Sequence, residues 1–347
     1  MRRFDYSFIR TSGFQSEIAD LMMRIGELRE RTAERRRANP DVFSGLERSA
    51  RFLSVRGSNA IEGIRTSDGR LESLMDRSVE PVGHDEREIA GYRDALAFIH
   101  ENHSELQLNE RTVLEIYRMM MSYSDDTDPG YKKTDNVIME IDADGRRRVH
   151  FRPVPAAETP EAMEQLMLAY IDADSNGICD LFLIPCFILD FLSVHPFPDG
   201  NGRMSRLLTL LLYYKAGFDA GKYISFEERI DQSKDRYYDA LTRSSEGWHD
   251  NSNDYSPFIT YYTGILFQCY RGLDRCFATV AGKSATKGNR IEAVILNSLV
   301  PIGKRDIMSM LPDVSQTTVE ACLHRMLENG TIEKIGSNRN ARYIRRN

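Results

Sequence analysis

Apolar residues recur at helical spacing along most of this chain. Ile18, Leu21, Met22, Ile25 and Leu28 follow one another at intervals that place them on one face of an α-helix. The same kind of spacing predicts helical segments over residues 58–62, 86–99, 112–122, 161–171, 185–194, 204–216, 290–299, 305–311 and 316–328. We therefore expect a mainly α-helical fold.

Strand-like alternation is confined to short stretches. Residues 137–141 and 147–151 flank Asp142-Ala-Asp-Gly145, where Asp-Gly is typical of a hairpin turn. Residues 331–335 and 341–344 flank a second polar loop and follow the last three predicted helices. That order of elements resembles a winged helix. The body is therefore expected to be an all-helical bundle with one exposed hairpin, followed by a small winged-helix-like α+β module.

The chain of 347 residues is long enough for two or three domains. We expect an N-terminal helical region at 1–110, a more apolar second region at 111–282 and the α+β module at 283–347. The boundary before the last of these is the stretch 281–288, which is small, polar and rich in glycine.

Composition excludes several classes of protein. Hydrophobic residues make up 41% of the chain and charged residues 28%, as in ordinary water-soluble proteins. The apolar run from Leu181 to Leu189 is too short to span a membrane, and the N-terminus lacks an apolar signal core. The five cysteines are an odd number without a C-x-x-C pair, which favours reduced thiols. We expect a cytoplasmic protein with no membrane partner.

Charge is unevenly distributed along the sequence. From Lys283 onward there are eleven Lys and Arg against six Asp and Glu, a net charge of +5, whereas the remainder has a net charge of -11. A basic module on an acidic body favours a nucleic-acid partner for residues 283–347. A basic tail can equally serve solubility alone.

A winged helix would place its third helix in the major groove of DNA. Here that helix is residues 316–328, with Ser315 as its cap and Thr317, Thr318, Glu320 and His324 along it, and Arg339 and Arg342 in the wing would contact phosphates. The acidic Glu320 and Glu328 count against DNA binding. A protein-docking or dimerisation module of the same shape is the alternative.

The segment from His195 to Arg206 carries the chemistry. It reads His-Pro-Phe-Pro-Asp-Gly-Asn-Gly-Arg-Met-Ser-Arg, in which Gly200-Asn-Gly202 precedes a helix and can present backbone N–H groups to an anion. Arg203 and Arg206 share one helix face, as suits a polyphosphate. Asp199 can supply an oxygen ligand for Mg²⁺, and His195 can accept a proton near pH 7. A base, a metal ligand, an anion-binding loop and two arginines together indicate phosphoryl or nucleotidyl transfer. The chain has no Walker-type or kinase motif.

This segment resembles the Fic family signature H-x-F-x-[DE]-G-N-G-R-x-x-R and matches it at every fixed position. The resemblance implies transfer of AMP from ATP, with Mg²⁺, to a Tyr, Ser or Thr hydroxyl of a target protein, including the chain itself. By that resemblance His195 deprotonates the hydroxyl, Asp199 binds Mg²⁺, and Phe197 anchors the loop in the core. The residues that would bind ATP are Gly200, Asn201 and Gly202 at the α-phosphate, Arg203 at the β-phosphate and Arg206 at the γ-phosphate.

Two further matches extend the resemblance over about residues 10–270. Ser58-Asn-Ala-Ile-Glu62-Gly63 fits the family's inhibitory pattern [ST]-x-x-x-E-[GN], and a carboxylate at Glu62 could pair with Arg206 in place of the γ-phosphate. An ordinary helical turn is the alternative. The predicted hairpin at 137–151 stands where the family has its flap, whose strand edge could bind a target segment.

The second further match is a helix that borders the adenine in the family. Tyr237-Tyr238-Asp-Ala-Leu241 fits it, with Tyr238 against adenine and Tyr237 in the core. Ser244 and Ser245 replace the usual Ala and Asn, so the asparagine contact is not expected.

Three functions agree with these features. The first is a protein adenylyltransferase inhibited by Glu62. The second is a Fic enzyme that removes AMP, with Glu62 aligning a water, or that transfers another phosphate-bearing group. A Doc-like phosphotransferase is disfavoured, because that branch has Lys where this chain has Gly202. The third is a nucleotide-sensing transcription regulator that binds DNA through residues 283–347. The oligomeric state, including a homodimer, is left open.

Overall fold

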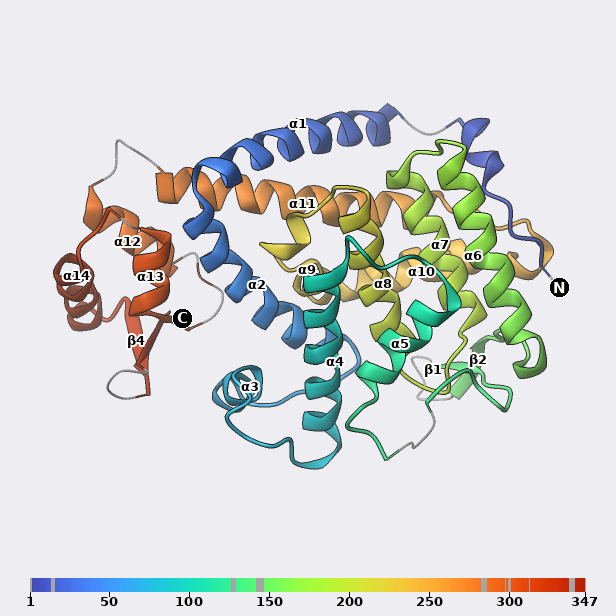
Figure 1. The fold of residues 1–347 in the computed structure, drawn as a ribbon, viewed down its shortest axis with the longest axis horizontal. Coiled ribbons are helices and arrows are strands. Elements are labelled where there is room, and N and C mark those ends of the chain that lie inside the picture. Colours follow the sequence, from blue (N-terminus) through green and yellow to red (C-terminus); the bar gives the residue numbers. More distant parts are fainter. Residues whose placement is uncertain are drawn as a thin grey trace. The chain divides into compact units, whose positions relative to one another are not determined.

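The computed structural model describes residues 2–13, 16–125, 129–141, 147–281, 286–296, 298, 301–311, 313–336 and 341–346. The predicted hairpin turn at 142–145, Arg339 and residues 282–285 of the expected linker lie outside these residues. The described part is mainly helical (Figure 1), which confirms the expected fold class.

The helices before the first strand are η1 (Ser7–Arg10), α1 (Ser16–Ala38), α2 (Pro40–Ile61), α3 (Asp68–Met75), α4 (Gly83–Asn102) and α5 (Glu110–Met120). The hairpin strands β1 (Ile138–Ile141) and β2 (Arg147–Phe151) come next. The following elements are η2 (Ala156–Glu158), α6 (Thr159–Ser175), α7 (Asp180–Val194), α8 (Asn201–Lys215), η3 (Ala220–Lys222), α9 (Phe226–Asp231), α10 (Lys234–Ser245), η4 (Trp248–Asp250) and α11 (Ser256–Ala281). The last elements are α12 (Lys287–Leu296), β3 (Ile302–Gly303), α13 (Lys304–Met310), α14 (Gln316–Glu328), β4 (Ile332–Ile335) and β5 (Arg342–Arg345).

The contacts within the chain divide it into two compact units. The first comprises Met1–Met22, Val55–Phe218 and Ile230–Ile265, and the second comprises Met23–Ser54, Asp219–Arg229 and Leu266–Asn347. The boundaries expected at 110 and 283 remain a prediction from sequence.

Helices α7 and α8 form the centre of the first unit. Both are buried along nearly their whole length, which matches the apolar sequence of α7 and of the second half of α8. Helix α7 packs against α6 and α8, and α4 packs against α5 and α8. The two central helices therefore hold the loop between them, residues 195–200, on rigid supports.

Helix α7 begins five residues earlier than the apolar pattern predicts. It starts at Asp180 and includes Pro185, which was expected to open it. A proline inside a helix leaves the carbonyl four residues earlier without its usual donor. Here that carbonyl, on Leu181, accepts a hydrogen bond from the Thr263 hydroxyl at 3.4 Å. The side chain of Thr263 thus compensates for the bond that Pro185 cannot make.

Helix α7 is also fixed at Asp190, which is fully buried. Its carboxylate accepts hydrogen bonds from the Tyr6 hydroxyl at 2.8 Å, the Trp248 indole at 2.7 Å and the Tyr255 hydroxyl at 2.9 Å. Nη2 of Arg2 lies 3.7 Å away. Residues from both ends of the first unit therefore satisfy one buried charge on its central helix.

The helix expected around residues 58–62 is the end of a much longer one. Helix α2 runs from Pro40 to Ile61, straight through Gly57. Pro40 is well suited to the first position of a helix, and a glycine inside one is tolerated where packing stabilises it. Gly63 has a φ of 84° and ends the turn after the helix. Glu62 therefore lies just beyond the last helical residue.

The expected hairpin is present as β1 and β2, paired antiparallel with Ile138 opposite Phe151 and Met139 opposite Val149. The register shifts between Ile138 and Met139. The side chains of Met139 and Val149 are exposed.

The last part of the second unit is the expected α+β module. Helices α12, α13 and α14 accompany an antiparallel sheet with strand order β3-β5-β4. Ser315 caps α14, as predicted, by accepting a hydrogen bond from the Thr318 N–H at 3.3 Å. The core of the module also includes Val42, Phe43 and Leu46 of α2. Among the described residues, no helix is long and apolar enough to cross a membrane.

Candidate active site

The loop between α7 and α8 has two left-handed residues. His195 ends α7 with φ 51° and ψ 60°, and Gly200 precedes α8 with φ 77°. A left-handed conformation is costly for a residue with a side chain. A Cβ atom at Gly200 would also lie 2.6 Å from Cε of Met120. Glycine is therefore favoured at position 200, and His195 is held in its conformation by the rest of the loop.

Asn201 locks this loop with its side chain. Its Oδ1 accepts a hydrogen bond from the Phe197 N–H at 2.9 Å, and its Nδ2 donates to the Phe197 carbonyl at 2.8 Å. The side chain of Asn201 is 2% exposed. Both of its polar atoms are used inside the loop, so a ligand would meet the backbone N–H of Asn201 rather than its amide.

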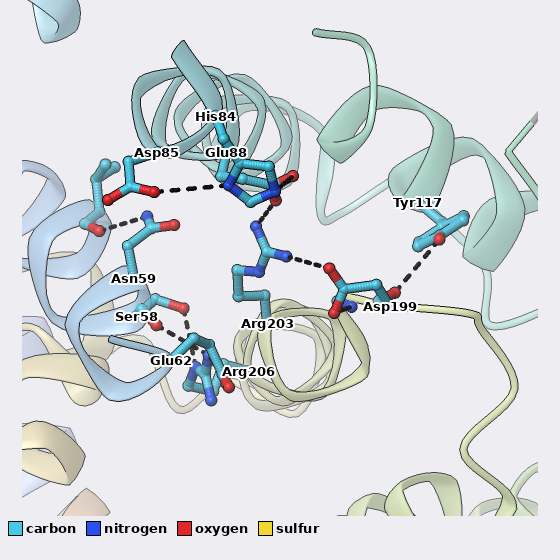
Figure 2. Close-up of polar contacts among 12 residues, drawn as sticks. Ser58, Asn59, Glu62, His84, Asp85, Glu88, Tyr117, Asp199, Arg203 and Arg206 are labelled. Carbon is cyan, nitrogen blue, oxygen red and sulfur yellow. Dashed lines mark hydrogen bonds and ion pairs between the residues drawn. The ribbon is translucent and has the colours of Figure 1, made fainter. Parts of the chain in front are cut away.

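Phe197 is buried, as predicted from sequence. Its ring stacks on Tyr117 with the ring centres 3.7 Å apart and the planes 8° from parallel. The Tyr117 hydroxyl donates to the Asp199 carbonyl at 3.3 Å. Helix α5, which carries Tyr117, therefore supports the loop on the side of Asp199 (Figure 2).

Lys132 and Asn136 support the other end of the loop, and sequence reasoning missed both. Nζ of Lys132 donates to the Val194 carbonyl at 3.2 Å and to Oδ1 of Asn136 at 2.9 Å. Nδ2 of Asn136 donates to the Phe197 carbonyl at 3.2 Å. Lys132 is 4% exposed, although a Lys-Lys pair in a polar segment is typical of a solvated surface.

The surroundings of His195 suit a base. Its Nδ1 lies 3.3 Å from the Leu192 carbonyl, and a proton on Nδ1 leaves the lone pair on Nε2. Burial, together with the charge of Lys132, lowers the pKa of His195 to about 4. The imidazole is therefore neutral at pH 7.

Asp199 lies at the start of α8 with its side chain 72% exposed. Its Oδ1 accepts the Gly200 N–H at 2.7 Å, and its Oδ2 lies 3.6 Å from Nη2 of Arg203. A single exposed carboxylate beside the expected phosphate site suits Mg²⁺, which is commonly bound by one or two carboxylates and substrate phosphates. The residues present therefore fit this ion with Asp199 as the protein ligand.

Arg203 is buried beside a carboxylate that the sequence did not reveal. Its Nη1 donates to Oε2 of Glu88, on α4, and both side chains are almost fully inaccessible. Nε of Arg203 is buried with no hydrogen-bond partner among the described residues. Glu88 belongs to the charged stretch at the start of α4, which reads as an ordinary solvated helix face.

Arg206 pairs with both ends of the predicted inhibitory motif (Figure 2). Its Nε donates to Oγ of Ser58 at 2.8 Å, and its Nη2 donates to the Ser58 carbonyl at 2.9 Å and to Oε1 of Glu62 at 2.8 Å. Arg206 is 1% exposed. Its Nη1 has no hydrogen-bond partner among the described residues. Nη1 of Arg206 is therefore a donor that a bound anion could use.

The pair between Glu62 and Arg206 is ionised. Burial alone would raise the pKa of Glu62, but Arg206, together with Arg203 and Lys234, holds this pKa below its usual value. Burial alone would lower the pKa of Arg206, but Glu62, together with Tyr237 and Tyr92, raises it. Each charge therefore stabilises the other in a largely desolvated place.

Gly202 permits the close approach of Glu62. A Cβ atom built on Gly202 would lie 2.3 Å from Oε1 of Glu62, well inside van der Waals contact. The absence of a side chain at position 202 is thus what allows the carboxylate to sit over the start of α8.

The predicted adenine-side helix is α10. Tyr237 is buried, as expected, while Tyr238 is 41% exposed. Nζ of Lys234 donates to the Ile61 carbonyl at the end of α2, and it lies 5.8 Å from the centre of the Tyr238 ring. Ser244 is buried, and its Oγ accepts the Phe258 N–H at 3.2 Å. The serine at the position of the usual alanine therefore has a structural partner.

Comparison with known proteins finds relatives of much of this chain. Residues 107–213 match the model of the Fic/DOC family. The protein adenylyltransferase fic-1 of Caenorhabditis elegans is 26% identical over 252 residues, which cover 70% of this chain and 43% of that protein. The protein adenylyltransferase Fic of Nematostella vectensis is 25% identical over 225 residues, or 62% of this chain and 46% of that protein. The chain thus spans less than half the length of these relatives.

Solved structures share the fold. A Fic family protein from Desulfovibrio desulfuricans superposes with a TM-score of 0.61 at 20% identity, covering 96% of this chain and 97% of that one. A Fic-domain signalling protein from Bacteroides thetaiotaomicron gives a TM-score of 0.58 at 21% identity, covering 74% of this chain and 94% of that one. The chain therefore contains a Fic/DOC domain at residues 107–213.

Proposed function

We propose that this protein transfers AMP from ATP to a hydroxyl side chain of a protein, and that Glu62 inhibits the transfer. The observation that carries the proposal is the pairing of Arg206 with Ser58 and Glu62 at the start of the helix that follows His195. A complete loop with a base, an anion site and two arginines suits the reaction. The pairing of the Glu62 carboxylate with Arg206 suits inhibition of that reaction.

In the proposed reaction the Nε2 atom of His195 accepts the proton of the target hydroxyl. The hydroxyl oxygen forms a bond to the α-phosphorus, and the bond from that phosphorus to the bridging oxygen of the β-phosphate breaks, so that pyrophosphate leaves. The N–H groups at Gly200 to Gly202 stabilise the charge on the α-phosphate. Mg²⁺, bound through Asp199, would neutralise phosphate charge.

Arg203 and Arg206 would bind the β- and γ-phosphates. Buried donors without partners at Nε of Arg203 and Nη1 of Arg206 support this assignment, because such donors are destabilising unless a ligand satisfies them. Glu62 occupies the Arg206 side chain and so competes with the γ-phosphate. The exposed edge of β1 and β2 would hold the target segment.

Labelled ATP and Mg²⁺ test the proposal. The Glu62→Gly protein is incubated with a lysate and with itself alone, and the labelled residue is identified by mass spectrometry. Adenylylated Tyr, Ser or Thr is expected, with none in the Glu62→Gly protein that also carries His195→Ala. Failure of the Glu62→Gly protein to label any protein would contradict the proposal.

Removal of AMP from a modified protein is the nearest alternative. In that reaction Glu62 would align a water molecule rather than block ATP. Incubation of an adenylylated protein with wild type and with Glu62→Gly separates the two, since removal requires Glu62 and transfer does not.

DNA binding by residues 283–347 is a separate candidate. The net charge of this module is +5, which favours a polyanion. On α14, however, Glu320 is paired with Lys304 at 3.0 Å and His324 lies 3.4 Å from Glu328. These acidic groups on the would-be reading helix weaken the case, and docking of a target protein is the competing role.

A further inference from the structure

Both arginines of the site are held by carboxylates, but the two carboxylates differ in their surroundings. Glu62 follows the last residue of α2 and its side chain is 32% exposed. Glu88 lies within α4 and its side chain is 7% exposed. A side chain at a helix end can leave its place by a smaller local change than one inside a packed helix. Glu88 is therefore the more firmly enclosed of the two carboxylates.

The position of the Arg203 guanidinium depends on this neighbour. The Glu88 carboxylate is the one hydrogen-bond acceptor that the described residues offer this group. The distance of 3.6 Å from Nη2 to Asp199 is that of an ion pair rather than a hydrogen bond. A long side chain held at one atom keeps its orientation only while that contact lasts. Loss of the Glu88 carboxylate would leave the orientation unspecified.

The contact with Glu88 directs the opposite side of the guanidinium to the loop. With Nη1 on Glu88, Nη2 lies beside Asp199 and 3.5 Å from where a Cβ atom of Gly200 would be. Figure 2 shows Arg203 between Glu88 and Asp199 in this way. Nη2 is therefore placed at the edge of the N–H groups that would bind phosphate.

We infer that Glu88 is the positioning residue of Arg203, fixing its guanidinium so that Nη2 can bind the β-phosphate of a nucleotide. The inference rests on the proposed function, since it assigns a phosphate to Arg203. It differs from a second inhibitory role, in which Glu88 would have to leave Arg203 before a nucleotide could bind. The two roles predict opposite effects of removing the carboxylate.

The experiment compares AMP, ADP and ATP binding by titration calorimetry with Mg²⁺, using the full chain with Glu62→Gly as background. Added Glu88→Gln is expected to weaken ADP and ATP about tenfold or more and to leave AMP unchanged, because AMP lacks a β-phosphate. A purely structural role would weaken all three nucleotides. Equal affinities, equal losses for all three, or tighter ADP binding would overturn the inference.

Glu86→Gln is the matched control. Glu86 lies on the same helix and makes a paired contact with Arg70, with Nε to Oε1 at 2.7 Å and Nη2 to Oε2 at 2.8 Å. Its loss breaks an ion pair on α4 without touching Arg203, and the ADP to AMP affinity ratio is expected to stay unchanged.

Thermal unfolding of each variant shows that it is folded. If Glu88→Gln does not fold, Glu88→Asp is measured in the same way, since it keeps the charge but shortens the reach to Nη1. A selective loss of ADP and ATP is again expected, and unchanged nucleotide affinities would overturn the inference. If the Glu62→Gly background itself binds no ATP, the proposed function fails at that point, before Glu88 is tested.

Discussion

Oε1 of Glu62 lies 2.8 Å from Nη2 of Arg206, in a place where Arg206 is 1% exposed. Glu62→Gly removes this partner and is expected to raise adenylylation at least tenfold, because Arg206 becomes free to bind the γ-phosphate. The measurement is incorporation of labelled AMP, including self-modification, at several ATP concentrations. Equal labelling by wild type and variant would contradict inhibition by Glu62.

Arg206→Ala is the control for that result. It also breaks the pair with Glu62, but it removes the residue that would bind ATP. Neither Arg206→Ala nor the double variant with Glu62→Gly is therefore expected to reach the activity of Glu62→Gly alone. Strong labelling by the double variant would show that Arg206 does not bind the γ-phosphate.

Gly202→Ala is expected to displace Glu62. Its Cβ would lie 2.3 Å from Oε1 of Glu62 and 3.3 Å from Nη1 of Arg206, and the free end of the glutamate is the atom that can move. In the wild-type background Gly202→Ala should raise AMP transfer. In the Glu62→Gly background it should give no increase. An increase in both backgrounds would assign the effect to the loop rather than to Glu62.

His195→Ala, in the Glu62→Gly background, is expected to lower transfer about a hundredfold or more while ATP still binds, because a base acts only when the hydroxyl attacks. Calorimetry measures the binding and labelled ATP measures the transfer. Near-normal labelling would remove His195 from this role.

The pH profile gives a second test of His195. Burial lowers its pKa to about 4 from the ordinary 6.5, and the base must be neutral to act. On its acid side, kcat/KM of the Glu62→Gly protein should therefore fall as the pH approaches about 4, not near 6.5. For the same reason the folded state binds this proton less tightly than the unfolded chain, so the group destabilises the fold increasingly below pH 6.5.

Lys132→Met is expected to move this acid limb upward. The charge of Lys132 adds to the effect of burial in lowering the pKa of His195, so its removal raises that pKa. The hydrogen bond to the Val194 carbonyl is also lost, and Tm should fall. Lys133→Met at the exposed neighbouring position is the control. An unchanged pH profile in Lys132→Met would contradict the electrostatic role.

The basic module is expected to bind duplex DNA modestly at best, with an affinity that falls as salt rises. Arg339, Arg342, Arg345 and Arg346 would supply the phosphate contacts. The test uses the full chain, because Val42, Phe43 and Leu46 complete the core of the module. Arg345→Glu with Arg346→Glu should reduce the slope of log affinity against log salt by about 2. No binding at low salt would retire the DNA hypothesis.

The parts of the site that are contiguous in sequence could be predicted. The residues from His195 to Arg206 interact with one another through one loop and one helix turn, so their spacing alone brings them together. The Ser58 and Glu62 motif could be matched to Arg206 only through the family resemblance, since 148 positions separate Ser58 from Arg206.

The supporting residues could not be predicted in the same way. Glu88 lies 115 positions from Arg203, and Lys132 lies in a polar segment that resembles surface. Glu88 and Arg203 become a buried pair only because α4 packs against α8. Helix α11 was also missed, because its aromatic residues Tyr261 and Tyr262 suit strands as well as helices, while tertiary packing buries Tyr262 completely.

The cluster around Asp190 bears on how the first unit is completed during synthesis. Its carboxylate needs the hydroxyl of Tyr255 and the indole of Trp248, which leave the ribosome some sixty residues after it. Helix α7 therefore acquires its full set of partners only when nearly the whole unit has been made. Glu62 is synthesised long before Arg206, so the carboxylate that pairs with this arginine is already present when α8 first forms.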